Sequence, residues 1–438
     1  MNVALIISPD YASHYFPLST VGRALAERGY QVTVATGPAL ERSVWRDGFA
    51  YRRLVLGPGS NPGLIREDGQ PPGEDENLAA FFEASRRGMV PTLLYQARRR
   101  LHDLLWQPDQ VMSRLGGLLG RLQPSVVICD QLSYSATAAL RALQQPYVGF
   151  LPGHPSAVAL DVAYGYPPSH PGRLTAADWD LAELHEVCRS VAEQFTARFN
   201  EAVARHNPNV SGVEDAFAAT SGMLTLVNYP GVLGRSYRLP ADCRFIGSAV
   251  RPVELPARLR EVVTSRARPR VYASLGSFFS TRRDILQKLV DSFRRLPVDL
   301  ILATGVTPPG ELGSLPESWV VEPYLPQPAL LPHCDLVVTH GGNNTVTEAL
   351  TAGKPLLVGP LSTDQFAGAA DIERAGLGLA FDPNHDDPGS IADLAERVLG
   401  GSAVDESRRL GKELRANPGP ELAADLITRR GTVTARTA

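Results

Sequence analysis

Residues 336–348 read Leu-Val-Val-Thr-His-Gly-Gly-Asn-Asn-Thr-Val-Thr-Glu, and this stretch decides the fold. An apolar run, a pair of glycines and then helix-forming residues predict a buried strand, a tight turn and a helix that begins near Thr345. The unpaired N–H groups of a helix N-terminus carry about half a positive charge and bind phosphate. Thr345 and Glu348 also fit the Thr-x-x-Glu pattern of a capping box, and His340 alone fits a core histidine. The stretch by itself therefore leaves a purely structural role open.

Polar and turn residues also mark the neighbouring predicted strands. Residues 323–327 read Pro-Tyr-Leu-Pro-Gln ahead of this strand, and residues 360–365 read Pro-Leu-Ser-Thr-Asp-Gln after the next one. Residues 274–277, Ser-Leu-Gly-Ser, end the first strand of this half of the chain. Ligands of open α/β sheets bind at the carboxyl ends of the strands. The three segments together favour a ligand site over a simple helix cap.

The spacing of apolar runs divides the chain into two α/β halves. Its 438 residues are about twice what one hydrophobic core usually supports. Strands are predicted at residues 3–7, 32–35, 125–129, 147–151, 270–274, 300–303, 319–322, 336–339 and 356–359. Prolines interrupt this rhythm at Pro240, Pro252, Pro256 and Pro269. We predict an N-terminal domain of residues 1–237, a linker of 238–269, a C-terminal domain of 270–420 and a tail of 421–438, for which a helix returning to the N-terminal domain is one interpretation.

Composition excludes several classes of protein. The net charge of -3 and the absence of a basic block argue against nucleic acid as a partner. No apolar run reaches the roughly 18 residues of a membrane span, and residues 1–8 predict a strand rather than a signal peptide. The four cysteines lack the spacing of a zinc site or a disulfide framework, which is typical of the reducing cytoplasm. We expect a cytoplasmic protein, monomeric or homodimeric.

The order of these motifs resembles the donor-binding domain of inverting glycosyltransferases of family 1, which have the GT-B fold. Glu348 follows His340 by 348 − 340 = 8 residues, and Asp364 follows Glu348 by 364 − 348 = 16, as in the plant motif of that family. The resemblance covers residues 270–380 strongly and the N-terminal domain loosely. It implies an α/β protein in which two Rossmann-like, doubly wound domains face each other across a cleft. The N-terminal domain would bind the acceptor and the C-terminal domain the nucleotide-sugar donor.

The resemblance assigns donor contacts residue by residue. The diphosphate would be bound by Ser277, His340, Asn344 and Thr345, the ribose by Gln327 and Glu348, and the sugar hydroxyls by Asp364 and Gln365. The same motifs add Leu325, Gly342 and Asn343 to the donor site. Tyr324 stands where plant relatives stack the nucleotide base on a tryptophan, and a tyrosine can stack as well.

The N-terminal half supplies a candidate general base. His14 lies in the segment after the first strand, where the family has its catalytic histidine, and Asp130 follows the strand at residues 125–129. A carboxylate beside an imidazole fixes its tautomer and favours its protonated form. A structural histidine and a helix-capping aspartate are the alternatives. The family's usual Gly-His is Ser13-His14 here.

The acceptor pocket is predicted from two irregular segments, residues 57–77 and 152–179, because long loops in compact domains are usually functional or disordered. The candidate lining residues are Phe81, Phe82, Tyr134, His154 and Tyr166.

The predicted reaction is a single displacement that moves a sugar from a nucleoside diphosphate to a small-molecule, natural-product acceptor. A UDP-hexose is the favoured donor, because a carboxylate and a carboxamide suit sugar hydroxyls, and a dTDP-sugar is the alternative. No cofactor and no metal are expected, since the helix dipole takes the place of a cation and the nucleotide sugar is a co-substrate. A nicotinamide oxidoreductase is disfavoured because residues 8–13 contain no glycine. A non-catalytic partner protein and a nucleotide-sugar epimerase of the same fold remain as alternatives.

Overall fold

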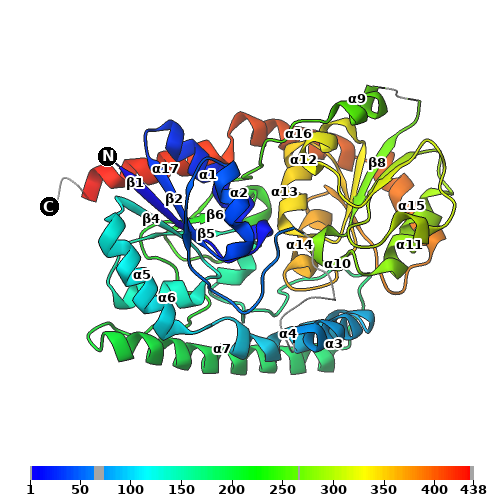
Figure 1. Cartoon of the computed structure of the whole chain (residues 1–438). Coiled ribbons are helices and arrows are strands. Elements are labelled where there is room, and N and C mark those ends of the chain that lie inside the picture. Colours follow the sequence, from blue (N-terminus) through cyan, green and yellow to red (C-terminus); the bar gives the residue numbers. More distant parts are fainter. Residues whose placement is uncertain (1, 64–73, 265–266, 435–438) are drawn as a thin grey trace.

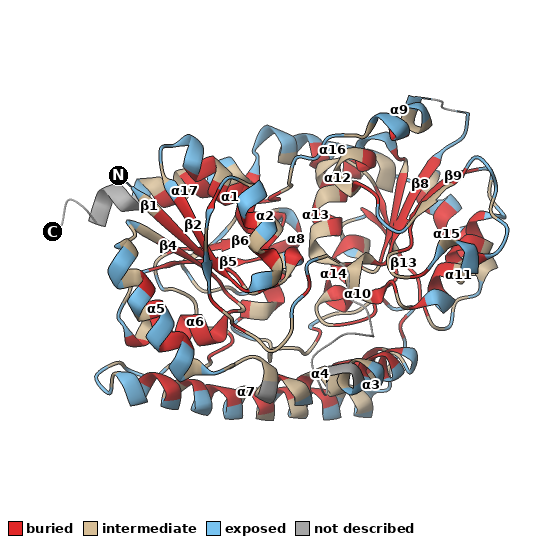
Figure 2. Cartoon of the chain, viewed as in Figure 1, coloured by how far each residue is buried: buried red, intermediate tan, exposed pale blue. Residues whose placement is uncertain are grey.

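The computed structural model describes residues 2–63, 74–264 and 267–434. Two parallel sheets, each flanked by helices, form two α/β domains that lie side by side (Figure 1). Buried residues concentrate in the strands and on the helix faces that cover them, as Figure 2 shows. The doubly wound GT-B architecture predicted from the sequence is confirmed.

The N-terminal sheet has seven parallel strands in the order β3-β2-β1-β4-β5-β6-β7. The strands are β1 Val3–Ile7, β2 Gln31–Thr36, β3 Ala50–Arg53, β4 Val126–Asp130, β5 Val148–Leu151, β6 Thr225–Val227 and β7 Cys243–Phe245. Ile7, at the carboxyl end of β1, pairs with Ala35 of β2 on one side and Cys129 of β4 on the other. The residues that follow β1 and β4 therefore emerge at the same edge of the sheet.

The C-terminal sheet has six parallel strands in the order β10-β9-β8-β11-β12-β13. The strands are β8 Arg270–Ser274, β9 Asp299–Ala303, β10 Val320–Glu322, β11 Leu336–Thr339, β12 Leu356–Val358 and β13 Gly378–Ala380. Thr339 pairs with Ser274 on one side and Val358 on the other. The three motifs that follow these strands consequently meet at one edge.

Helices cover both sheets. Those that precede β8 are α1 Ala12–Glu27, α2 Glu41–Arg46, α3 Glu74–Arg86, α4 Met89–Asp103, α5 Pro108–Leu122, α6 Tyr134–Ala142, α7 Asp178–His206, α8 Gly231–Gly234 and α9 Ala257–Thr264. Those that follow are α10 Gly276–Phe279, α11 Arg283–Phe293, α12 Gln327–Leu330, α13 Asn343–Thr351, α14 Gln365–Arg374, α15 Pro388–Leu399, α16 Ala403–Ala416 and α17 Gly419–Thr434. Single 3₁₀ turns lie at Pro38–Leu40, Pro155–Val158, Pro309–Leu312 and Leu331–His333.

The chain crosses between the domains more often than the predicted boundaries allow. Strand β7 pairs with β6, so the N-terminal sheet extends into the predicted linker of residues 238–269. Helix α3 lies within the predicted N-terminal domain, but it packs into the core of the C-terminal domain. Helix α17 begins at Gly419 and buries Ala423, Ala424 and Ile427 in the core of the N-terminal domain. Figure 1 shows α17 running along α1.

No helix among the described residues is long and apolar enough to cross a membrane.

Candidate active site

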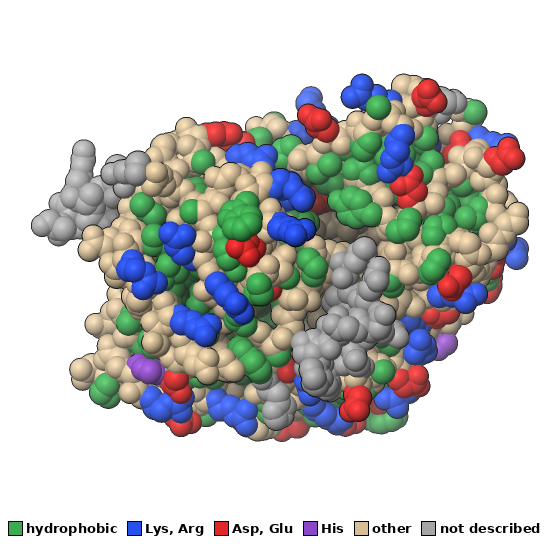
Figure 3. Space-filling model, viewed as in Figure 1, with side chains coloured by type: hydrophobic (Ala, Val, Ile, Leu, Met, Phe, Trp, Pro, Cys, Tyr) green, Lys and Arg blue, Asp and Glu red, His purple; other side chains and the backbone are tan. Residues whose placement is uncertain are grey.

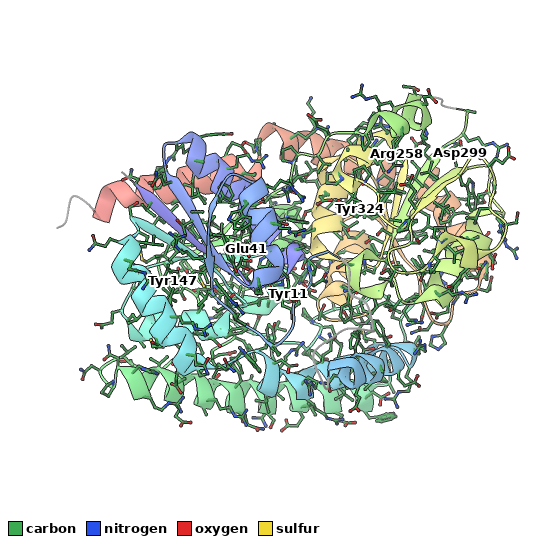
Figure 4. All side chains as sticks on the ribbon, viewed as in Figure 1. Tyr11, Glu41, Tyr147, Arg258, Asp299 and Tyr324 are labelled. Carbon is green, nitrogen blue, oxygen red and sulfur yellow. The ribbon has the colours of Figure 1, made fainter. Side chains whose placement is uncertain are left out.

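A cavity of about 820 Å³ lies between the two domains, at the carboxyl ends of both sheets. Its walls include the segments that follow β1, β5, β8, β11 and β12. Tyr11 and Tyr324 line it from opposite domains, and Figure 4 shows them on facing sides of the junction. Arginine side chains lie on the N-terminal side of this junction in Figure 3, since the N-terminal domain contains no lysine. The positions match the rule that open α/β sheets bind ligands at strand ends.

The turn between β11 and α13 presents a free helix N-terminus to the cavity. Gly341 has a φ of 88°, a left-handed conformation that glycine adopts without strain. Helix α13 begins at Asn343, and its N-cap Gly342 provides no side-chain hydrogen bond. The predicted capping box is therefore wrong, because Thr345 lies inside the first turn. The first N–H groups of α13 have no partner within the helix, and this geometry can bind a diphosphate.

His340 is packed tightly between two glycines beneath this turn. A Cβ atom added to Gly276 would lie 2.5 Å from its Cε1 atom, and one added to Gly342 would lie 2.6 Å from its Nε2 atom. Burial lowers the pKa of His340 to about 4, although Asp364 and the backbone of Ser274 oppose this shift. The imidazole is consequently neutral at pH 7. It can donate or accept a hydrogen bond at a phosphate without adding charge.

Gln327 and Glu348 form a pair at the cavity wall. The Gln327 side-chain amide donates to Glu348 Oε2 at 2.6 Å and to Thr345 Oγ1 at 3.2 Å. Burial raises the pKa of Glu348 to about 7, and the hydrogen bond from Gln327 only partly offsets this effect. The second carboxylate oxygen is free to accept hydrogen bonds from vicinal hydroxyls. This arrangement suits a ribose, as predicted for both residues.

Three residues of the predicted donor site bind the N-terminal domain in this structure. The Asn343 side-chain amide donates to the carbonyls of Pro152 and Asn228, at 2.6 and 2.9 Å. The Asn344 amide donates to the carbonyl of Ser13 at 2.8 Å. Ser277 Oγ accepts a hydrogen bond from Asn61 at 3.0 Å. All three line the cavity, so diphosphate contacts from these side chains compete with contacts between the domains.

Tyr324 and Leu325 both border the cavity, but they differ in exposure. Tyr324 is 68% exposed, whereas Leu325 is buried in the core beneath it. An exposed aromatic ring beside a buried aliphatic side chain offers a flat surface for a nucleotide base.

Asp364 and Gln365 point in different directions. Asp364 lines the cavity, and its carboxylate accepts hydrogen bonds from the backbone N–H of His154 and the hydroxyl of Thr363, both at 2.9 Å. Gln365 is buried, and its side-chain oxygen accepts from the N–H groups of Leu361 and Ser362. Of Asp364 and Gln365, which were both predicted to bind sugar hydroxyls, Asp364 alone therefore faces the cavity. Gln365 shapes the loop before α14 instead.

His14 and Asp130 meet at the carboxyl edge of the N-terminal sheet. His14 lies in the first turn of α1, not in a loop ahead of it, and its Nδ1 is 2.9 Å from Asp130 Oδ2. The other oxygen of Asp130 accepts from the N–H of Leu132, so the aspartate also shapes the turn after β4. Burial, the largest single effect, lowers the pKa of His14, but the charge and hydrogen bond of Asp130 together with the charge of Asp364 outweigh it, so the pKa of His14 is raised.

The exposure of the two side chains is compatible with the prediction that His14 is a base and Asp130 orients it. His14 lines the cavity with 22% of its side chain exposed, and Asp130 is fully buried. Within the described residues, no hydrogen bond joins His14 Nε2 to the protein. This atom is therefore available to a substrate hydroxyl.

Four of the five predicted acceptor residues lie away from the cavity. Phe81 and Phe82 pack against Phe278 and Phe279 in the C-terminal core, because α3 crosses to that domain. Tyr134 is buried among aromatic rings in the N-terminal core. Tyr166 lines the cavity.

His154 has a structural role. Its Nε2 is 2.9 Å from Asp371 Oδ2 on α14, and its Nδ1 contacts Ser156 Oγ at the same distance. Both segments predicted to form the acceptor pocket border the cavity. The segment after β5 does so through residues 152, 153, 156, 157 and 164–167, and the segment of residues 57–77 through Asn61 and Gly63. Residues 64–73 of the latter segment lie outside the described residues.

One Asp-x-Asp sequence, the pattern of metal-dependent glycosyltransferases, occurs at Asp178-Trp179-Asp180. Both aspartates lie in the first turn of α7, and neither lines the cavity. No group of three or more His, Cys, Asp or Glu side chains suited to a metal ion occurs in the part of the chain that the structure describes.

Comparison with known proteins shows similarity to glycosyltransferases. Residues 287–428 match the family described as erythromycin biosynthesis protein CIII-like, C-terminal domain. The crystal structure of the kitacinnamycin glycotransferase covers 98% of this chain and 98% of its own, with a TM-score of 0.68 at 21% identity. The chain has the GT-B fold of this glycotransferase, with two parallel-sheet α/β domains. The spinosyn rhamnosyltransferase SpnG complexed with thymidine diphosphate has the same fold, with a TM-score of 0.66 at 19% identity over 98% of this chain and 100% of its own.

Curated relatives of this chain include three bacterial proteins. The demethyllactenocin mycarosyltransferase of Streptomyces fradiae is 30% identical over 60% of this chain and 54% of its own. The NDP-glycosyltransferase YjiC of Bacillus licheniformis is 27% identical over 56% of this chain and 63% of its own. The zeaxanthin glucosyltransferase of Pantoea ananas is 23% identical over 96% of this chain and 94% of its own. The chain thus spans just over half of the length of the first relative and less than two thirds of the second.

Proposed function

We propose that this chain transfers a sugar from a nucleoside diphosphate donor to a hydroxyl group of a small-molecule acceptor. The observation that carries the proposal is the His14–Asp130 pair, which shares one cavity with the unpartnered N-terminus of α13. The pair supplies a base and the helix supplies an anion site. The mycarosyl, glucosyl and rhamnosyl transfer named for relatives and neighbours supports the same class of reaction.

The proposed reaction is a single displacement at the anomeric carbon of the sugar. The acceptor oxygen gives its proton to His14 Nε2 and forms a bond to C1, while the bond between C1 and the diphosphate oxygen breaks. The diphosphate leaves with the electron pair toward the N–H groups of α13. The buried Asp130 stabilises the imidazolium that forms. Attack opposite the leaving group inverts the configuration at C1.

Metal independence is part of the same proposal. The nucleoside diphosphate leaves with three negative charges and needs compensation, and the dipole of α13 provides about half a positive charge beside neutral His340. Arg46 and Arg251 add positive charge to the cavity wall from the N-terminal domain. Binding of a nucleotide sugar in the presence of EDTA is the expected result. Loss of binding on chelation would contradict it.

We propose a nucleotide sugar with a pyrimidine base as the donor, and uracil and thymine are the two candidate bases. UDP-hexose was favoured because Asp364 and Gln365 were expected to bind hydroxyls together. Only Asp364 faces the cavity, which weakens that reason. The neighbouring structures of VinC and SpnG were solved with thymidine diphosphates. Competition between UDP-glucose and dTDP-glucose for binding decides between the two bases.

The test is product analysis with both donors and a panel of hydroxylated aromatic and macrocyclic acceptors, with EDTA present throughout. A glycoside found by mass spectrometry supports the transfer, and a β-linked product from an α-linked donor supports inversion. A new nucleotide sugar formed without acceptor would identify an epimerase. Nucleotide binding with no product from any acceptor would favour a non-catalytic partner protein. Failure to bind either donor would refute the proposal.

A further inference from the structure

Arg100 is a buried cation in the cavity wall, and none of the acids that the structure describes pairs with it. It lies on α4, is 9% exposed and borders the cavity. Its Nη1 donates a hydrogen bond to the carbonyl of Tyr164 at 3.2 Å, and the guanidinium forms no ion pair with any described residue. A guanidinium has five N–H donors and stays charged at all physiological pH values. Buried charges in proteins are normally paired, so this one calls for an anion.

The guanidinium ends a stack of aromatic rings. Its central carbon lies 4.6 Å from the ring centre of Tyr164. Tyr164 stacks on Phe217 at 4.1 Å and 10°, and Phe217 stacks on Phe195 at 4.3 Å and 11°. A Cβ atom added to Gly165 would lie 1.6 Å from Arg100 Nη1. Any side chain at position 165 would therefore collide with the guanidinium, and glycine leaves space for it. The side chain is thus held in one orientation before any ligand binds.

The neighbouring groups do not neutralise Arg100. Burial raises the pKa of the Cys188 thiol, although Arg100 opposes this shift, so the thiol stays neutral at pH 7. Burial likewise raises the pKa of the Tyr164 hydroxyl. Asp364 and Asp130 are close enough to act on Tyr164, but both already accept hydrogen bonds from other groups.

The other cations of the cavity wall differ from Arg100. Arg251 forms an ion pair with buried Asp47, and Arg46 is exposed to solvent. Among the arginines of the cavity wall, Arg100 is the one that is buried and has no acid beside it within the described residues.

The position of Arg100 relates it to the reacting groups. Gln96 lies one helical turn earlier on α4, and its side-chain oxygen accepts a hydrogen bond from the N–H of Thr363 at 3.1 Å. Thr363 is next to Asp364 and has a φ of 49°, an unusual conformation for a β-branched residue. Gln96 and Arg100 therefore lie on the same face of α4, and this face contacts the loop that carries Asp364.

We propose that Arg100 and Tyr164 form a binding site for a carboxylate carried by one of the two substrates. The inference rests on the proposed function, since it names the substrate that the same cavity accepts. The planar guanidinium can donate two parallel hydrogen bonds to a carboxylate. Tyr166 and Pro167, which border the cavity beside it, belong to the predicted acceptor segment, which favours an acidic acceptor. A uronic acid sugar on the donor presents the same chemical group and is the second source.

Two matched pairs of probes distinguish the sources. The acceptor pair is 6-hydroxy-2-naphthoate and 6-hydroxy-2-naphthamide, which differ in charge and little in shape. The donor pair is UDP-glucuronate and UDP-glucose. Dissociation constants are measured by calorimetry or fluorescence for the wild-type chain, Arg100→Met, Arg100→Gln and the control Arg98→Met. Arg98 lies on the same helix, but its side chain is exposed and pairs only with exposed Glu183.

We expect the wild-type chain to prefer the anionic member of the naphthalene pair at least tenfold. Both Arg100 variants should reduce that ratio to about one and leave the affinity for the amide within twofold, whereas Arg98→Met should keep the preference. A preference confined to the UDP-sugar pair and lost with Arg100 would assign the carboxylate to the donor. A chain that shows no preference in either pair, or one that keeps its preference in both Arg100 variants, overturns the proposal. Binding of UDP-glucose is scored separately, so failure of the proposed function is recognised by loss of nucleotide binding in the wild-type chain.

Discussion

Binding of a nucleotide sugar should release a proton from Glu348. Burial raises the pKa of this carboxyl group to about 7, so below pH 7 most of the free protein carries it in the neutral form. Ribose hydroxyls that donate hydrogen bonds stabilise the ionised form. The pKa of Glu348 in the complex should therefore fall toward its ordinary value of 4.5. Affinity must then decrease as the pH is lowered, since protonated Glu348 has to ionise first.

The two pKa values set the size of the effect. With about 7 in the free protein and about 4.5 in the complex, the apparent dissociation constant should be about thirtyfold weaker at pH 5.5 than at pH 8.5. That factor corresponds to about 2 kcal/mol. At pH 6, about 0.9 proton should be released for each nucleotide sugar bound. UDP-glucose is a suitable probe because its two phosphates are diesters that do not titrate in this range.

Calorimetry in buffers with different ionisation enthalpies measures the proton release directly. The control is Glu348→Gln, which keeps the size of the side chain and an oxygen that can accept the hydrogen bond from Gln327. Asp130 and Asp364 raise the pKa of His14, and bound diphosphate favours its protonated form. Proton uptake by His14 is common to both proteins and opposite in sign, so the difference between them isolates Glu348. Equal pH dependence in the wild-type chain and in Glu348→Gln would refute the assignment of the carboxylate to the ribose.

Three further substitutions test the remaining assignments. His14→Ala should lower turnover by about 10² or more and leave the melting temperature and donor affinity unchanged, because the base acts in the transition state. In the wild-type chain kcat/KM should rise with pH through a pKa above 6.5, since the raised pKa keeps His14 protonated at lower pH, and Asp130→Asn should move that rise to lower pH. Asp364→Ala should raise the KM for the nucleotide sugar and leave the Kd for the nucleoside diphosphate within about twofold, and an equal loss for both ligands would place this residue at the phosphates. Gly276→Ala should cost about 1 to 3 kcal/mol of stability, because φ is 69° at this position and the new Cβ meets His340, and a thermal melt that does not shift would contradict that packing.

The parallel core of the fold was predictable because its strands are continuous apolar runs. Arg270–Ser274 and Leu336–Thr339 were predicted with the bounds that the structure has, as was Val3–Ile7. Short edge strands were missed. Ala50–Arg53 is mostly exposed, and Cys243–Phe245 lies in a proline-rich segment, so neither shows the apolar pattern of a buried parallel strand.

Residues that follow predicted strands were located well, because parallel strands bring their carboxyl ends to one edge whatever the loops do. His14 and Asp130 are 116 residues apart and still meet, since β1 and β4 are neighbours in the sheet. The direction of each side chain was not predictable in the same way. Asp364 and Gln365 are adjacent in sequence, yet their side chains point in different directions. Asp364, at the N-cap position of α14, faces the cavity, whereas Gln365, the first residue of the helix, points into the preceding loop.

The residues that line the proposed acceptor pocket could not be predicted, because the chain segments around it cross from one domain to the other. Phe81 and Phe82 are aromatic residues of the kind that line pockets. They lie on α3, however, which packs into the C-terminal core, and their rings are buried there against Phe278 and Phe279. Arg100 was missed for the converse reason, since the run Arg98-Arg99-Arg100 predicts a solvated face. Burial without a described acid beside it distinguishes Arg100 from Arg98 and Arg99, each of which pairs with an acid on the surface. The proposed acceptor site thus depends on tertiary placement, whereas the proposed diphosphate site depends on a local turn that the sequence displays directly.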